Sequence, residues 1–187
     1  MTELLRYVAF IRNVMIGRAG LDRDVLLRIF TEAGATEPRS HLATGNVSFG
    51  CDQGAITQLI DATQGGLART MGRFEPVFVR SVVALRGSVQ SLPFRATPIS
   101  DVGHRCVTFT DSRARMDLPF VSAREDAYIF DSHDTDWYSV TRLVDGRGGN
   151  VNRMIERALS CAATTRNWNT IERVVRLHDG SSNDADG

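Results

Sequence analysis

The sequence contains no lysine, because all 22 basic side chains among its 187 residues are arginines. This absence excludes a Schiff-base lysine and the phosphate-binding lysine of a P-loop. The 22 arginines are balanced by 22 aspartates and glutamates, so the formal net charge is zero. A chain without excess positive charge has no bulk field to hold a polyanion, and general nucleic-acid binding is therefore disfavoured.

Long hydrophobic runs are also missing. No stretch approaches the ~18 uninterrupted apolar residues that indicate a membrane span. Contents of 42% hydrophobic and 24% charged residues are typical of a globular protein. No separate apolar segment precedes the first strand-like run, so we expect no secretory signal. The sequence therefore predicts a cytoplasmic protein without a membrane partner.

Cysteine is scarce, and no cluster of metal ligands is visible. Cys51, Cys106 and Cys161 lie far apart and form no C-x-x-C pair, so we expect reduced, buried thiols rather than a zinc site. The four histidines lie in unrelated segments. The acidic residues around His133 do not match EF-hand spacing. We expect no metal site and no resident cofactor.

The first half of the chain has the pattern βαββαβ. Strands are predicted at 4–11, 39–44, 46–49 and 76–80, and helices at 25–33 and 56–67. Gly34 closes the first helix, whereas Gly65 and Gly66 interrupt the second and weaken its pattern. This order is typical of the ferredoxin-like unit, in which both helices pack on one face of an antiparallel sheet.

The hydrophobic pattern of the second half indicates another α+β lobe. It does not give the order of the strands in that lobe. A helix is predicted at 81–91, and the prolines that follow it mark a boundary. Beyond them, strands are predicted at 105–110, 127–130 and 138–144. Two helices follow, one from Val151 and one around 171–177. We therefore expect lobes at 1–92 and 93–178. Residues 179–187 have almost nothing to bury, and a disordered tail is predicted there.

The run 163–170, Ala-Thr-Thr-Arg-Asn-Trp-Asn-Thr, opens the last predicted helix. One interpretation is structural: Asn169 caps the helix, and Trp168 packs beside it. The other is a site at which Arg166 binds a phosphate, sulfate or carboxylate at the helix N-terminus while Trp168 stacks on a flat ligand. The candidate ligand-binding residues of this run are Thr165, Arg166, Asn167, Trp168 and Asn169.

Two further turns are candidates for the same ligand. Residues 145–150, Asp-Gly-Arg-Gly-Gly-Asn, precede the helix at Val151, and their glycines could form an anion-binding nest with Arg147 beside it. An ordinary strand-to-helix turn uses the same residues. Arg12 follows the first strand, and Asn46 belongs to a Gly45-Asn46 turn that a simple hairpin also explains.

Several of these segments resemble the bacterial domain-of-unknown-function 1697 family. The resemblance covers nearly the whole chain in the right order and rests on 7–12, 45–49, 76–81, 92–94, 107–109 and especially 164–170, Thr-Thr-Arg-Asn-Trp-Asn-Thr. It implies an α+β fold of two ferredoxin-like (split βαβ) lobes, with antiparallel sheets and helices packed on them. It implies no activity.

The chain departs from the family at two polar turns. Relatives read Arg-Gly-Ile-Asn-Val-Gly-Gly-Lys after the first strand, whereas this chain has Met15 and Ala19 in place of the Asn and the Lys. A family Gly-Arg-Ser/Thr-Lys turn is replaced here by 146–149, Gly-Arg-Gly-Gly. If the lysines contact a ligand in relatives, this chain has lost two cations, and Arg18 could replace one.

Two functions remain open from the sequence. The first is binding of a small anionic ligand, phosphate- or sulfate-bearing or a nucleotide, in a cleft between the lobes, with or without group-transfer activity in a specialised biosynthetic pathway. The second is a noncatalytic or half-site subunit of a hetero-oligomeric complex. It would bind its partner through the apolar loop Val14-Met15-Ile16.

Overall fold

The computed structural model describes residues 4–180, and the chain divides after Ala84 into two compact units. The division falls inside helix α3 (Val82–Gln90), eight residues before the predicted boundary at 92/93. No helix within residues 4–180 is both long and apolar enough to span a bilayer. The predicted tail from 181 onward lies outside the described residues, whereas Asp179 and Gly180 end a helix.

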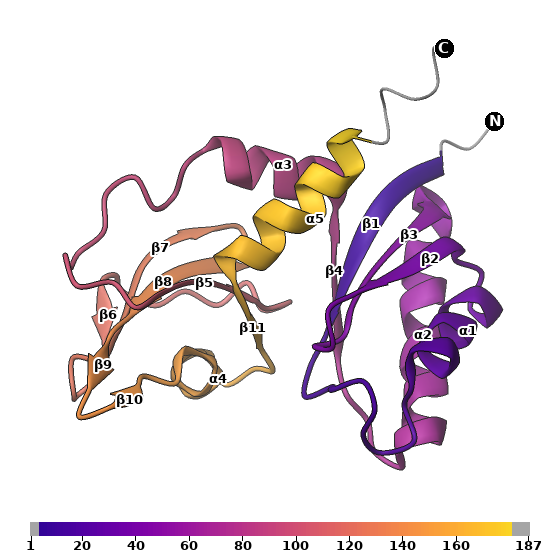
Figure 1. Cartoon of the computed structure of the whole chain (residues 1–187), viewed down its shortest axis with the longest axis horizontal. Coiled ribbons are helices and arrows are strands. Elements are labelled where there is room, and N and C mark those ends of the chain that lie inside the picture. Colours follow the sequence, from indigo (N-terminus) through magenta and orange to yellow (C-terminus); the bar gives the residue numbers. More distant parts are fainter. Residues whose placement is uncertain (1–3, 181–187) are drawn as a thin grey trace. The chain divides into compact units, whose positions relative to one another are not determined.

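The first unit has the predicted βαββαβ order. Its elements are β1 (Leu4–Ile11), α1 (Arg23–Glu32), β2 (Thr36–His41), β3 (Asn46–Asp52), the 3-10 turn η1 (Gln53–Ala55), α2 (Ile56–Met71) and β4 (Val77–Ser81). The sheet order is β2-β3-β1-β4, and every neighbouring pair is antiparallel. This is the ferredoxin-like arrangement. Both helices lie on one face of the sheet (Figure 1).

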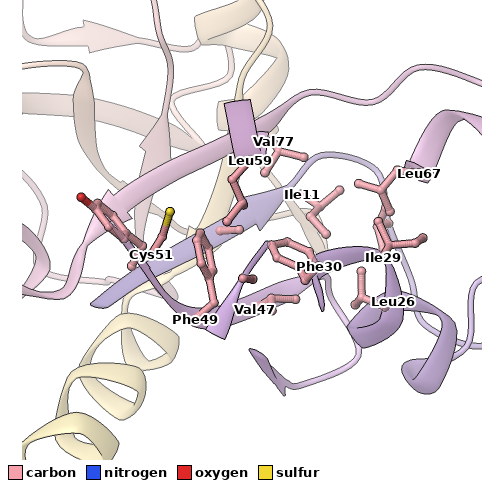
Figure 2. Packing of buried hydrophobic residues seen from close by; sticks show 14 of the residues in the cluster. Ile11, Leu26, Ile29, Phe30, Val47, Phe49, Cys51, Leu59, Leu67 and Val77 are labelled. Carbon is pink, nitrogen blue, oxygen red and sulfur yellow. The ribbon is translucent and has the colours of Figure 1, made fainter. Parts of the chain in front are cut away.

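The core of the first unit lies between that sheet face and the two helices. Figure 2 shows Phe30 of α1 and Phe49 of β3 pointing toward each other, with ring centroids 5.4 Å apart. Helix α1 begins where the Asp22 carboxylate accepts a hydrogen bond from the Val25 amide at 2.8 Å. The residues it buries, Leu26, Ile29 and Phe30, follow a helical spacing.

Helix α2 continues through the two glycines that weakened its sequence pattern. A Cβ atom on Gly66 would lie 2.7 Å from Ile29 Cγ2 of α1, whereas a Cβ on Gly65 would meet nothing closer than the Arg69 guanidinium at 3.5 Å. Gly66 therefore permits the close approach of α1 and α2, and Gly65 has no such role.

The second unit is built on a five-stranded antiparallel sheet in the order β11-β5-β8-β7-β6. Its strands are β5 (His104–Phe109), β6 (Phe120–Val121), β7 (Ala127–His133), β8 (Asp136–Thr141) and β11 (Thr164–Asn167). Helix α4 (Val151–Leu159) lies on one face and α5 (Trp168–Gly180) on the other (Figure 1). The small hairpin β9 (Leu143–Val144) and β10 (Arg147–Gly148) precedes α4.

The second unit is ferredoxin-like in its strands but lacks one helix. The strands β5, β7, β8 and β11 stand in the same spatial order as β1, β2, β3 and β4 of the first unit. The connection from β5 to β7, which is helix α1 in the first unit, is here an irregular segment that contains only β6. Met116 and Leu118 of this segment pack against the core formed with α4, so they partly replace the missing helix.

Candidate functional site

The run 164–170 does lead into the last helix, but its first four residues form strand β11, which the sequence did not predict. This strand pairs with β5, with Arg166 opposite Val107 and Asn167 opposite Cys106. Helix α5 then begins at Trp168, so Asn169 lies within the helix and the prediction that it is the cap was wrong. The capping interaction comes from Asn167, whose Oδ1 accepts a hydrogen bond from the Asn169 amide at 3.1 Å.

Strand geometry separates the side chains that the sequence grouped together. Successive residues of a strand point to opposite faces, so Thr165 and Arg166 diverge. The Thr165 hydroxyl lies 2.8 Å from the Thr108 hydroxyl and donates to Asn152 Oδ1 of α4 at 3.2 Å. Thr165 therefore ties β11 to β5 and to α4.

Arg166 is half-buried and makes hydrogen bonds within its own strand. Its Nη1 donates to Thr164 Oγ1 at 2.7 Å and to the Thr165 carbonyl at 2.9 Å. Burial lowers the pKa of the guanidinium from its usual value to about 10. These contacts give Arg166 a structural role in β11.

Trp168 packs in an aromatic cluster. Its ring centroid lies 5.2 Å from that of Phe94 and 5.8 Å from that of Tyr138. The indole is buried, so most of its faces are covered by protein. It still borders a pocket of about 320 Å³ that Leu92, Phe94 and Arg105 also line.

Asn167 and Asn169 do converge on a pocket. Together with Gly103, His104 and Arg105 they line a polar cavity of about 280 Å³ at the start of α5. Val102 is the remaining lining residue, so no acidic side chain borders the cavity. Arg105 lines both this pocket and the neighbouring apolar pocket beside Trp168.

The guanidinium of Arg105 is not neutralised locally in the polar pocket. Within residues 4–180, neither Arg105 nor His104 has an ion-pair partner, and both are exposed. The sequence analysis missed both because they lie about sixty positions before the distinctive run. Only the pairing of β11 with β5 brings the two segments together.

Arg147 belongs to a tight hairpin. Asp145 and Gly146 are the two residues between β9 and β10, and their φ angles of 52° and 72° are those of a type I′ turn. Gly149 has a different constraint, because a Cβ there would lie 2.5 Å from the Ala127 Cβ. The turn thus explains Gly146, and the close approach to Ala127 explains Gly149.

The two candidate residues of the first unit, Arg12 and Asn46, form polar contacts with nearby residues of that unit. Arg12 Nη1 forms an ion pair with the buried carboxylate of Glu75 at 3.3 Å, and Arg73 Nε approaches the same carboxylate at 2.9 Å. Asn46 is fully buried in β3, and its Nδ2 donates to the His41 carbonyl at 3.1 Å. Asn46 thereby closes the loop between β2 and β3.

The apolar loop after β1 exposes only part of its surface. Val14 is buried and Ile16 is partly buried against the core, whereas Met15 is 46% exposed. The Ile16 amide donates to the Ala43 carbonyl at 2.8 Å, next to Leu42, which is also 46% exposed.

Of the three thiols predicted to be buried, only Cys51 is; Cys106 and Cys161 are partly exposed. Desolvation nevertheless raises the pKa of the Cys161 thiol and raises that of the Cys106 thiol to about 11. Within residues 4–180, no three His, Cys, Asp or Glu side chains come together in an arrangement that could hold a metal ion.

Comparison with known proteins gives a family and a fold. The chain is similar in structure to conserved bacterial protein SP0830 from Streptococcus pneumoniae, with a TM-score of 0.68 over 94% of this chain and 98% of that one, at 12% sequence identity. No curated protein matches the chain. The family described as protein of unknown function DUF1697 matches residues 4–128. That match spans most of the chain, which therefore belongs to the DUF1697 family.

Proposed function

We propose that the chain binds a small phosphate- or sulfate-bearing ligand in the polar pocket at the start of α5. The observation that carries the proposal is the convergence of Arg105, His104, Asn167 and Asn169 on one cavity without an acidic side chain. Guanidinium and amide groups are donors suited to the oxygens of such an anion. The N-terminal end of α5 adds a favourable dipole.

The neighbouring pocket supports a nucleotide as the ligand class. Arg105 lines both pockets, so an anionic group in the polar one leaves the rest of the ligand beside Phe94 and Trp168. The two cavities of about 280 and 320 Å³ together have the size of a small-molecule site. Both belong to the second unit, so the proposal does not require a cleft between lobes.

Group transfer is the form of catalysis that this site would favour. Among the residues lining the polar pocket, His104 is the one side chain able to accept a proton. No lining residue is a Ser, Thr, Cys or Lys nucleophile. A reaction here would therefore depend on positioning and charge stabilisation. We further propose that it serves a specialised biosynthetic pathway in the cytoplasm.

The test is a calorimetric titration of the full chain with inorganic phosphate, pyrophosphate and AMP. Arg105→Gln should weaken all three, by up to about fivefold, because it removes an exposed charge from the anion site. Leu92→Ser should weaken AMP alone, since Leu92 lines only the neighbouring pocket. Arg113→Gln is the matched control, an exposed arginine outside both pockets. Equal affinities in Arg105→Gln and Arg113→Gln would overturn the proposal.

One observation favours the alternative of a partner-binding subunit. Met15 and Leu42 are exposed apolar side chains on neighbouring loops of the first unit. A Met15→Ser, Leu42→Ser double variant should then lose a protein partner that the wild-type chain retains through purification from its host. Retention of that partner by the variant would remove this alternative.

A further inference from the structure

A third pocket, larger than the two at the start of α5, lies away from the proposed anion site, on the flank of α4. It has a volume of about 490 Å³ and is bordered by edge strand β6, by the turn at 148–150 and by the exposed side of α4. None of its lining residues borders the polar pocket at the start of α5. The two cavities are therefore independent sites.

Two arginines of α4 line this pocket one helical turn apart. Arg153 and Arg157 stand at positions i and i+4, where like charges repel by about 0.2–0.5 kcal/mol in an isolated helix. Within residues 4–180, neither guanidinium has a hydrogen bond or ion pair. This side of the pocket therefore has two cations and nothing that balances them.

The one acidic residue at the pocket is already engaged. Asp126 Oδ1 accepts a hydrogen bond from the Ser122 hydroxyl at 2.7 Å, and Oδ2 lies 3.6 Å from Arg124 Nε. Asp126 is also buried. Arg124, which also lies 3.9 Å from the exposed carboxylate of Asp145, pairs with the carboxylate of Asp126, whereas the two arginines of α4 have no ion pair among the described residues.

The opposite wall is apolar and open to solvent. Phe120 and Val121 form β6 and are 37% and 38% exposed. Met154 and Ala158 of α4 also line the cavity. A volume near 490 Å³ with several apolar walls falls within the range of ordinary small-molecule sites.

We propose that this pocket binds an amphiphilic anion, with a carboxylate, sulfate or phosphate at Arg153 and Arg157 and an apolar body against Phe120, Val121 and Met154. Charge complementarity selects this occupant over an uncharged apolar molecule, and the apolar wall selects it over a bare inorganic anion. Gly149 maintains the pocket's shape, because its lack of a Cβ lets the turn at 148–150 approach Asp126 and Ala127.

The test uses two fluorescent probes of similar shape, the anion 8-anilinonaphthalene-1-sulfonate and its uncharged analogue N-phenyl-1-naphthylamine. The full chain should bind the sulfonate at one saturable site. Arg153→Gln with Arg157→Gln should weaken it by roughly tenfold or more and leave the neutral probe almost unchanged, as expected for two exposed charge contacts. Val121→Ser should weaken both probes.

Matched controls separate this site from the proposed function. Arg23→Gln removes an exposed arginine of the other unit and should change neither probe. Arg105→Gln should weaken phosphate but leave the sulfonate probe unaffected, and Arg153→Gln with Arg157→Gln should do the reverse. Each proposal can therefore fail while the other stands.

Three outcomes would overturn the inference. One is sulfonate affinity that is unchanged in the double arginine variant. Another is equal weakening of the charged and neutral probes by that variant, because a lost charge contact affects only the anion. The third is concentration-dependent self-association of the wild-type chain that Val121→Ser abolishes, which would make a second copy of the chain the occupant.

Discussion

Arg166 is the residue at which pattern and geometry diverge most. In sequence it is the obvious cation beside a predicted helix start, but strand β11 turns its guanidinium toward Thr164 Oγ1 and the Thr165 carbonyl. Arg105, which has no distinctive sequence context, reaches the pocket instead. A residue-level prediction from sequence can identify a charged side chain but not the face of the strand from which it projects.

We expect Arg166→Ala to destabilise the fold by about 1.5–3 kcal/mol, the usual range for hydrogen bonds made by a charged group. Urea unfolding followed by circular dichroism measures this change. Arg113→Ala is the control and should lie within about 0.5 kcal/mol of wild type, because Arg113 is exposed. A fully stable Arg166→Ala protein would contradict the structural role given to Arg166.

Cys106 should resist alkylation in the folded protein. Desolvation raises the pKa of its thiol to about 11, well above the usual value for a cysteine. The thiolate that reacts with iodoacetamide is therefore about a hundredfold rarer near pH 8 than for a solvent-exposed cysteine. Mass spectrometry of the labelled protein should show slow modification of Cys106 that accelerates only as pH approaches 11. Rapid labelling at pH 8 would contradict the desolvation of this side chain.

At the scale of elements, the order of the first unit was predictable, although its second strand spans Thr36–His41 rather than the predicted 39–44. The buried strand at 4–11 and the order βαββαβ follow from hydrophobic periodicity, and both are present. The end of α1 is also as predicted, with Gly34 at φ 97° just beyond it. These features are local, so neighbouring residues in the sequence determine them.

Helix α2 allows an element-level test with two adjacent glycines. Gly65→Ala should stabilise the protein by about 0.5–1 kcal/mol, because alanine costs less backbone entropy in a helix interior. Gly66→Ala should instead destabilise it by about 1–3 kcal/mol, because the new methyl group would lie 2.7 Å from Ile29 Cγ2. Thermal or urea unfolding of the two variants measures both effects. Similar stabilities for the pair would contradict the close packing of α1 and α2.

Strand β11 could not be predicted from the sequence. Its four residues, Thr-Thr-Arg-Asn, have no apolar alternation, and the strand exists because it pairs with β5 at the edge of the sheet. The pairing is non-local, so the sequence pattern contains no signal for it. The polar pocket depends on this pairing, which is why Asn167 and Asn169 were recognised without Arg105 and His104.

At the scale of the whole molecule, the two units share a strand order but differ in their first connection. Helix α1 fills that connection in the first unit, whereas the second unit has a segment with only the short strand β6. The hydrophobic pattern predicted that the second half forms an α+β lobe, but it did not predict the order of the strands. The absence of a predicted helix between 110 and 127 was the one sequence signal of this difference.

Hydrogen exchange should distinguish the two connections. Amides of α1 are hydrogen-bonded within a helix, so they should exchange slowly. Amides between 111 and 119 lie in irregular backbone and should exchange orders of magnitude faster, despite the packing of Met116 and Leu118. Mass spectrometry of peptides from the two segments compares them in one experiment. Equal protection would contradict the irregular structure of the second connection.

The most direct test of anion binding is a phosphate titration of ¹⁵N-labelled full-length protein followed by nuclear magnetic resonance. The account predicts saturating shifts centred on the amides of Gly103, Arg105 and Asn169 and on the side-chain amides of Asn167 and Asn169, which all border one pocket. The same shifts should be strongly reduced in Arg105→Gln. Saturating shifts centred elsewhere, or none that saturate, would contradict the assignment of the start of α5 as the anion site.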